Sequence, residues 1–271
     1  MLESLMLQQL ALFAVTGAAA GVLAGLFGVG GGLIMVPALA FVLPHQGVAP
    51  DIVMQVAIGT SLAVIGITSL SSTRAHHKRG GVRWDVLKGF APGLALGALG
   101  GAFVAHLLKG RTLEIIVGVG ALLIALQMLR AAPQASSESR IPPPPVPELL
   151  AVGGLIGVLS ALVGIGGGSL SVPYLAARRL PMVQAVGSAA AGGIPIAWGG
   201  ALGFVLSGKD IVGLPGLHLG YISLAGFAGL AVFSVLTAPW GARMAHQWPA
   251  RRLKQAFAAL LACIGLLMLL R

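Results

Sequence analysis

Long apolar segments are the feature that most limits what this chain can fold into. Each contains about 20 residues, the length that an α-helix needs to cross the hydrocarbon core of a bilayer. Only 9% of the residues are charged, whereas soluble domains carry about 25%. The sequence therefore predicts an all-α polytopic membrane protein, with apolar segments at residues 53–73, 89–108, 112–129, 182–206, 219–239 and 253–270.

A polar, proline-rich stretch divides the chain. Residues 131–148 read AAPQASSESRIPPPPVPE, and neither the serines nor the proline run suits a spanning helix. We therefore expect a first membrane repeat at 1–130, a linker at 131–148 and a second membrane repeat at 149–271.

The two halves share a glycine-rich block. GLFGVGGGLIMVPAL begins at Gly25, and ALVGIGGGSLSVPYL begins at Ala161. The blocks align without gaps, pairing Gly28, Gly30, Gly31, Gly32 and Pro37 with Gly164, Gly166, Gly167, Gly168 and Pro173. A similar stretch follows each block and pairs Gln55 with Gln184, Gly59 with Gly187, and Thr60 with Ser188. These matches predict an internal duplication.

Basic residues indicate that the second repeat is inverted relative to the first. The first half concentrates its cations at 74–88, whereas the matching loop of the second half holds only Lys209. In the second half the cations gather at 243–254 instead. Placing 74–88 in the cytoplasm brings most of the 17 lysines and arginines to that side, as the positive-inside rule requires. The linker is then cytoplasmic and both termini lie outside.

Inversion gives each glycine block a specific form. Three spanning helices follow the block in each half, so the block must enter and leave the membrane on the same side. We predict a re-entrant or broken helix hairpin in each half, with the glycines at its bend. The sequence leaves open whether eight or ten membrane segments result.

Helix ends at these bends are candidate anion sites. A helix that begins after Gly32 or Gly168 points unpaired N–H groups and the positive end of its dipole toward the bend, and glycine allows close approach. Packing between helices is the competing interpretation of the blocks, and it is the one we favour for Gly93, Gly97 and Gly101. The candidate substrate-binding residues are Gly28, Gly30, Gly31, Gly32, Leu33, Gly164, Gly166, Gly167, Gly168, Ser169 and Ser171, with Gln55, Thr60, Ser61, Gln184 and Ser188 on the following helices.

Other classes of site lack support in the sequence. The net charge of +10 comes from loop cations that orient membrane helices, so we expect no nucleic-acid partner. We find no Cys/His metal set and no nucleophile–base group, and we expect no metal, no cofactor and no enzymatic activity. The glycine blocks also lack the Gly-Lys-Ser/Thr that ends a phosphate-binding loop.

The duplicated G-x-GGG-x(4)-P blocks, each followed by a helix that opens A-x-G-[TS], resemble those of the TauE/SafE sulfite exporter family. The resemblance implies a multi-pass transporter of the bacterial inner membrane, from a family whose members move small sulfur-containing anions such as sulfite or organosulfonates. We expect a secondary transporter that exports such an anion by alternating access around a midplane site at the two helix N-termini. A passive anion channel and a carrier of small organic carboxylates stay open as alternatives. The expected partners are a small anion and the lipid bilayer, and a homodimer is left open.

Overall fold

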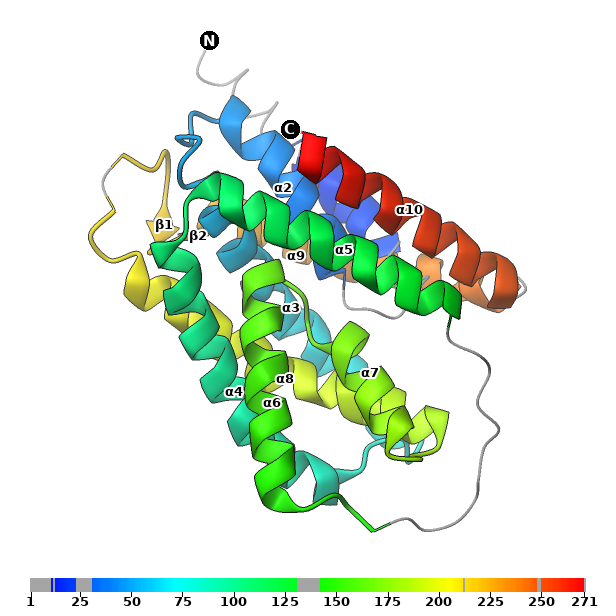
Figure 1. Cartoon of the computed structure of the whole chain (residues 1–271). Helices are drawn as coiled ribbons and strands as arrows, with labels where there is room; N and C mark the ends of the chain where they lie inside the picture. Colours follow the sequence, from blue (N-terminus) through cyan, green and yellow to red (C-terminus); the bar gives the residue numbers. More distant parts are fainter. Residues whose placement is uncertain are drawn as a thin grey trace.

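The computed structural model of the chain is almost entirely helical (Figure 1). It describes residues 11, 13–22, 31–130, 142–211, 213–247 and 250–270. A helix at Phe13–Val22 comes first. The labelled elements after it are α2 (Gly32–His45), α3 (Val53–Lys78), α4 (Trp84–Leu107), α5 (Gly110–Arg130), α6 (Val146–Val163), α7 (Gly168–Ala177), α8 (Met182–Ser207), β1 (His218–Leu219), β2 (Ile222–Ser223), α9 (Leu224–Gln247) and α10 (Ala250–Leu270).

Helix lengths confirm the prediction of an all-α polytopic membrane protein. In the described part of the chain, α3, α4, α5, α6 and α8 are long and apolar enough to cross a membrane. The predicted segment 219–239 was wrong in its start. A short antiparallel hairpin, β1–β2, comes first, and its turn contains Gly220 at φ 55. The apolar helix therefore begins only at Leu224.

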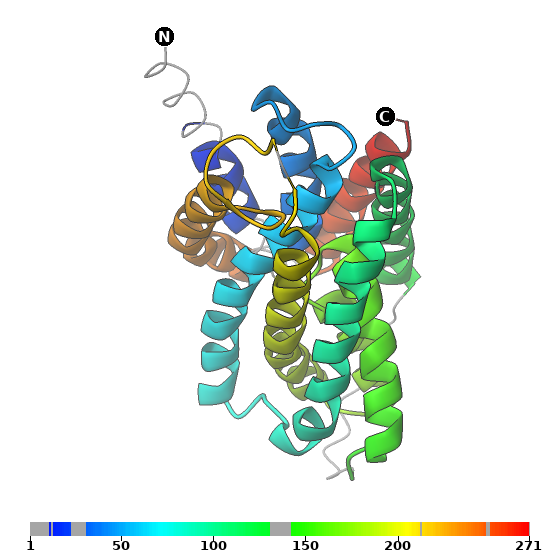
Figure 2. The same ribbon diagram turned by 90° about the vertical axis from the view of Figure 1, so that its left-hand side faces the viewer.

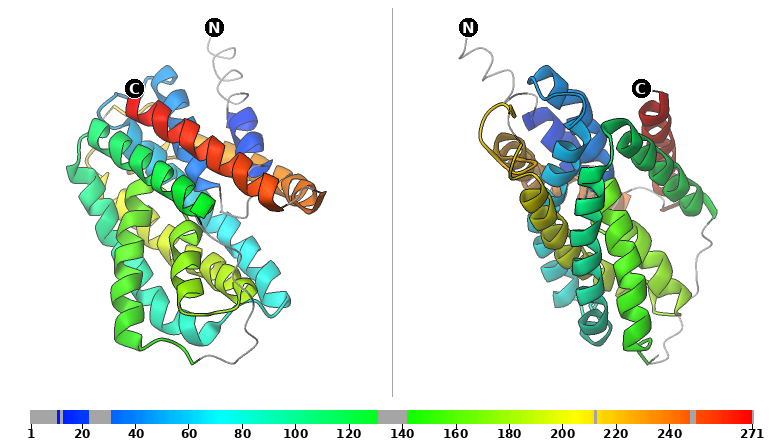
Figure 3. Two further views of the ribbon diagram at one scale, coloured as in Figure 1. Left: turned by 45° about the vertical axis from the view of Figure 1, so that its right-hand side comes forward. Right: turned by 60° about the vertical axis from the view of Figure 1, so that its left-hand side comes forward.

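The helices pack as a bundle with a separate pair laid across it. In the bundle, α4 contacts both α6 and α8, and α3 packs on α8. The separate pair is α5 and α10, which lie side by side in Figures 1 and 3. Arg111, near the start of α5, donates hydrogen bonds to the carbonyl oxygens of Met268 and Leu269 at the end of α10, at 3.2 and 2.7 Å. The two helices of this pair are therefore antiparallel.

Glycines bring α4 and α6 into backbone contact. A Cβ atom on Gly97 would overlap the carbonyl oxygen of Gly154, and one on Gly93 would overlap that of Leu150. At Gly101 the nearest atom would be the carbonyl oxygen of Val158, at 2.8 Å. Small residues permit such close crossings of membrane helices. The packing role predicted for these three glycines of α4 is therefore confirmed.

The loops gather at two opposite ends of the molecule (Figure 2). The α3–α4 loop and the start of α6 lie at one end. The α2–α3 loop, the α4–α5 connection and the segment between α8 and β1 lie at the other. The distribution of cations predicts this same grouping. Which end faces the cytoplasm stays a prediction.

Candidate functional site

The residues directly before α2 and α7 are two glycines with the same backbone conformation. Gly31 has φ 77 and ψ −13, and Gly167 has φ 74 and ψ −15. A residue with a Cβ atom adopts this left-handed conformation at a cost of about 1–2 kcal/mol, which explains glycine at both positions. No side chain of the described residues caps either helix. The first N–H groups of both helices therefore lack the side-chain partner that a helix start usually has.

The second glycine block is the bend of a hairpin. Helix α6 ends at Val163 and is followed by Gly164, which has φ 76, and α7 begins at Gly168. At the other end of the hairpin, the Tyr174 hydroxyl of α7 donates a hydrogen bond of 2.6 Å to Glu148, in the first turn of α6. Arg178, directly after α7, forms an ion pair with the same carboxylate. The chain therefore leaves this hairpin beside the point where it enters.

The arms of this hairpin differ in length. With 18 residues α6 is about 27 Å long, while α7, with 10 residues, is about 15 Å long. The bend therefore lies at the tip of one span-length arm and one half-length arm. The predicted residues Gly28 and Gly30 of the first glycine block lie outside the described residues.

The start of α2 touches the second bend. A Cβ atom on Gly32 would overlap the carbonyl oxygen of Gly164, so the two backbones are in direct contact. The Ser61 hydroxyl of α3 donates a hydrogen bond of 3.2 Å to that same oxygen. Of the predicted residues, Gly32, Ser61 and Gly164 thus come together, and all three are buried.

The starts of α2 and α7 differ in accessibility. Gly31, Gly32 and Leu33 are buried, whereas Gly168 and Ser169 are half-buried. A Cβ atom on Gly168 would meet nothing within 4 Å, so open space lies beside the first residue of α7. The structure thus blocks the start of the first helix and leaves that of the second approachable.

Three serine hydroxyls lie close to the second bend in sequence and have no partner among the described residues. The Oγ atoms of Ser160, Ser169 and Ser171 are buried and make no hydrogen bond there. Ser171 lies one turn into α7, and its Oγ would be 3.6 Å from a Cβ atom on Gly167. Its hydroxyl therefore faces the start of the helix, where the uncapped N–H groups are.

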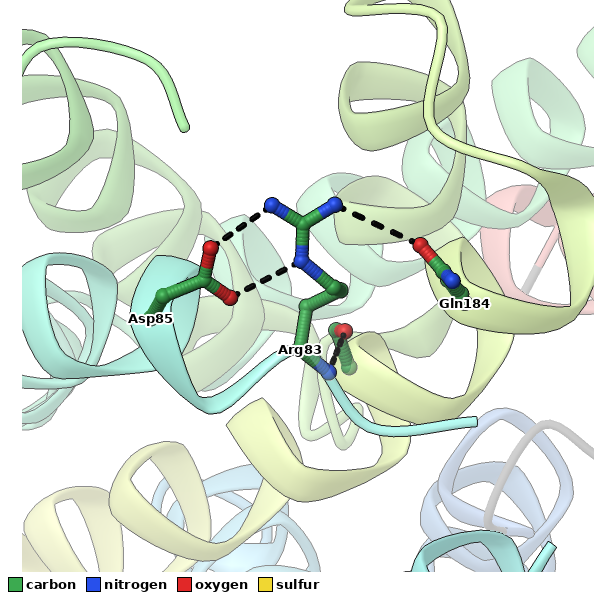
Figure 4. A network of polar contacts seen from close by, with 4 residues as sticks. Arg83, Asp85 and Gln184 are labelled. Carbon is green, nitrogen blue, oxygen red and sulfur yellow. Dashed lines mark hydrogen bonds and ion pairs between the residues drawn. The ribbon is translucent and has the colours of Figure 1, made fainter. Parts of the chain in front are cut away.

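Three other side chains predicted to bind substrate form hydrogen bonds away from the second bend. Gln55 donates from Nε2 to the carbonyl oxygen of Leu108, at 2.9 Å. Gln184 and Ser188 lie at the start of α8 against the α3–α4 loop, in a network around Arg83 (Figure 4). The guanidinium of Arg83 donates to both carboxylate oxygens of Asp85 and, at 3.4 Å, to the side-chain oxygen of Gln184. The hydrogen bond to Asp85 is the main reason why the pKa of Arg83 is raised above its ordinary value.

Comparison with known proteins identifies the family. The family model described as "Sulfite exporter TauE/SafE" matches residues 13–268. The chain belongs to the TauE/SafE sulfite exporter family. A "Probable membrane transporter protein" of Haemophilus influenzae is 36% identical over 259 residues, which cover 95% of this chain and 97% of that protein. A protein of the same description from Methanocaldococcus jannaschii is 28% identical over 275 residues, covering 99% and 98%. No solved structure gives a significant match.

Membership of the TauE/SafE family makes the chain a membrane transporter rather than an enzyme. Among the described residues, no group of three or more His, Cys, Asp or Glu side chains is arranged to hold a metal ion. The chemistry available at the second bend is hydrogen-bond donation by main-chain amides and hydroxyls. Such groups suit binding and release of an anion.

This TauE/SafE protein also contains a reciprocal pair of contacts that its sequence did not predict. The Ser188 hydroxyl of α8 accepts a hydrogen bond of 2.9 Å from the backbone N–H of Arg83, directly before α4. The Thr60 hydroxyl of α3 accepts one of 3.0 Å from the backbone N–H of Ser223, directly before α9. Thr60 and Ser188 are aligned positions of the duplication. Each half therefore holds the start of a helix in the other half.

Ser160 is a candidate residue that sequence reasoning missed. It is the one serine or threonine in α6 and precedes Gly164 by a helical turn. Its carbonyl oxygen accepts hydrogen bonds from the N–H groups of Gly164 and Ile165, at 2.8 and 3.0 Å. A lone hydroxyl one turn before a glycine bend, in a stretch that is apolar from Leu149 onward, is a signal that could have found it.

Proposed function

We propose that this protein is a secondary transporter that exports small sulfur-containing anions, such as sulfite or organosulfonates, across the bacterial inner membrane. Alternating access around the second glycine bend is the proposed mechanism. The observation that carries the proposal is the uncapped start of α7 after Gly167, with open space beside Gly168. The start of α2, which follows a matching left-handed glycine at Gly31, packs against the same bend through the contact between Gly32 and Gly164.

The physical basis is the charge at a helix start. Aligned peptide dipoles give a helix N-terminus an effective charge of about +0.5, and the unpaired N–H groups act as hydrogen-bond donors. In inverted-repeat transporters, substrate sites typically lie where helices are interrupted at membrane depth, with helix N-termini directed at anionic groups. A fixed cation is not needed for such a site. An anion held by dipoles and hydroxyls alone can also be released, which a transporter requires.

Transport assays on purified protein in liposomes test the proposal. Vesicles are loaded with labelled sulfite or labelled taurine, a small sulfonate, and efflux is measured with and without the protein. We expect protein-dependent efflux that saturates with substrate and is stimulated by unlabelled substrate on the opposite side. Stimulated exchange is a property of a carrier and not of a passive channel.

The outcomes separate the candidates. Non-saturating flux without exchange would replace the carrier with a channel. Movement of cations or neutral solutes, with no flux of sulfite, sulfonates or carboxylates, would remove the basis for any anion site at the helix starts. Gly168→Ala fills the open space beside α7 while keeping the fold, so this variant should show less protein-dependent anion flux than the wild type.

A further inference from the structure

Unpartnered hydroxyls are concentrated at the second bend. In the described part of the chain, six buried side-chain nitrogen or oxygen atoms lack a hydrogen-bond partner, and three of them are the Oγ atoms of Ser160, Ser169 and Ser171. Ser160 and Ser171 are fully buried, with 0% relative exposure. Buried polar groups are nearly always paired in native proteins. Three exceptions within one turn of a single bend therefore point to a missing acceptor.

Other helical hydroxyls in this protein show what an ordinary partner is. Ser207 donates to the carbonyl oxygen of Gly203 at 2.8 Å, and Thr237 donates to that of Phe233 at 2.8 Å. Ser234 and Ser69 bond to the carbonyl oxygens three residues earlier, at 3.2 and 3.3 Å. Bonding back to the preceding turn is thus the usual arrangement. Ser160 and Ser171 depart from it.

At the positions of the first half that align with Ser169 and Ser171, no side chain can donate. These positions are Leu33 and Met35. Both are buried, at 3% and 0% exposure. The start of α2 is also in contact with the backbone at Gly164. A ligand that approached the two helix starts would therefore find side-chain donors and open space at α7.

The number of donors bears on the ligand's head group. The start of α7 combines the uncapped N–H groups of its first turn with hydroxyls that can each donate one hydrogen bond. A carboxylate presents two oxygens, whereas sulfite and a sulfonate each present three, arranged as a pyramid around sulfur. The amides of the first turn of α7 and the Ser171 hydroxyl that faces them, with the unpartnered Ser160 one turn before the bend, offer several donors, and a head group with three oxygens can accept from more of them than a carboxylate can.

We infer that the second half of the chain, and not the first, binds the substrate through the serine hydroxyls around the start of α7. These hydroxyls select a three-oxygen head group over a carboxylate. The inference rests on the proposed function, because it concerns the same site. It assigns Ser160, Ser169 and Ser171 as residues that determine specificity. It assigns Gly32 and Leu33 to helix packing.

Matched ligand pairs test this selection on the purified full-length protein. Methanesulfonate is compared with acetate, and taurine with β-alanine, because each pair differs in the head group alone. We expect the wild-type protein to bind each sulfonate at least about tenfold more tightly than its carboxylate partner. Loss of one hydrogen bond to a charged group corresponds to roughly a tenfold or greater loss of affinity. Ser171→Ala should therefore weaken binding of methanesulfonate by that factor and reduce the preference over acetate.

Two further variants keep the test decisive. Ser234→Ala removes a buried hydroxyl that already has a carbonyl partner, and it should leave both affinities unchanged. Ser169→Ala repeats the test at a half-buried position if Ser171→Ala does not fold. Equal wild-type affinities for sulfonate and carboxylate, or unchanged affinities in both Ser169→Ala and Ser171→Ala, would overturn the inference while leaving anion transport intact. Absence of binding and of transport for every anion would instead reject the proposed function.

Discussion

Two adjacent glycines of the second bend should respond in opposite ways to the same substitution. Gly167 has φ 74, and a Cβ atom there would overlap Cδ1 of Ile196. Gly168, the first residue of α7, has open space where its Cβ atom would lie. Alanine at each position therefore separates the role of the glycines in folding from their role in binding.

The expected changes in stability follow from the backbone. Gly167→Ala places a Cβ atom in the left-handed region, which costs about 1–2 kcal/mol, and it also forces Ile196 to move. Gly168→Ala replaces glycine by the best helix former in a helix, which contributes up to about 1 kcal/mol in favour of folding. The two variants should thus differ by about 2–3 kcal/mol in their free energy of unfolding.

The expected changes in binding have the opposite pattern for Gly168. Its new methyl group occupies the space beside the uncapped N–H groups, so substrate should be displaced from a protein that is as stable as the wild type or more so. Thermal unfolding in detergent reports stability, and calorimetric titration with methanesulfonate reports binding. We expect Gly168→Ala to lose affinity by about tenfold, the equivalent of one hydrogen bond to a charged group.

Either of two results would refute this reasoning. Wild-type affinity in Gly168→Ala would mean that the open space beside α7 is not substrate space, and the glycines would then serve packing. Equal destabilisation by the two substitutions would mean that the left-handed conformation of Gly167 does not set the cost.

Three further predictions concern the scaffold. Gly97→Ala should push α4 away from α6 and lower the melting temperature, because its Cβ atom would overlap Gly154. Gly100→Ala, whose Cβ atom would meet nothing within 4 Å, should leave the melting temperature unchanged, and equal melting temperatures of the two variants would contradict the backbone contact between α4 and α6. Thr60→Val and Ser188→Ala should each destabilise the protein by about 1–3 kcal/mol, since each removes the acceptor of a backbone N–H group, as measured by thermal unfolding; an unchanged transition would show that water replaces the hydroxyl. In a Cys263→Ala background, a membrane-impermeant maleimide should label Leu217→Cys from outside intact cells and Val146→Cys only after the membrane is opened. Leu217 and Val146 are both exposed, at 78% and 57%, and the reverse labelling pattern would invert the proposed orientation.

The bends of the candidate site could be predicted from the sequence, because clustered glycines in an apolar chain favour a break between helices. A GxGGG block in an apolar chain implies a bend, and the matching alignment implied equal roles for Gly31 and Gly167. The structure gives these two residues nearly identical dihedral angles. The chain also contains a signal for the end of the arm after each block, because Pro and polar residues lie at 44–51 and 178–181.

Long-range partners could not be predicted in the same way. Gln184 and Ser188 suit a polar site in a membrane, but a single sequence does not show that the α3–α4 loop folds over them and presents Arg83. Thr60 likewise bonds to Ser223, a residue far along the chain. The β1–β2 hairpin could not be predicted in the same way, because its residues are largely apolar and resemble the start of a spanning segment, and only Gly216 and Gly220, which both adopt positive φ, indicate turns there.

The bonds between Thr60 and Ser223 and between Ser188 and Arg83 have a consequence for how the chain is assembled. A fragment that ended before the proline-rich stretch would keep one main-chain amide whose acceptor resides on the missing fragment, and the converse holds for the remainder. Each piece would therefore expose an unpaired amide at a helix start until it met the other. The proline-rich stretch, by tethering the two pieces, makes that meeting intramolecular.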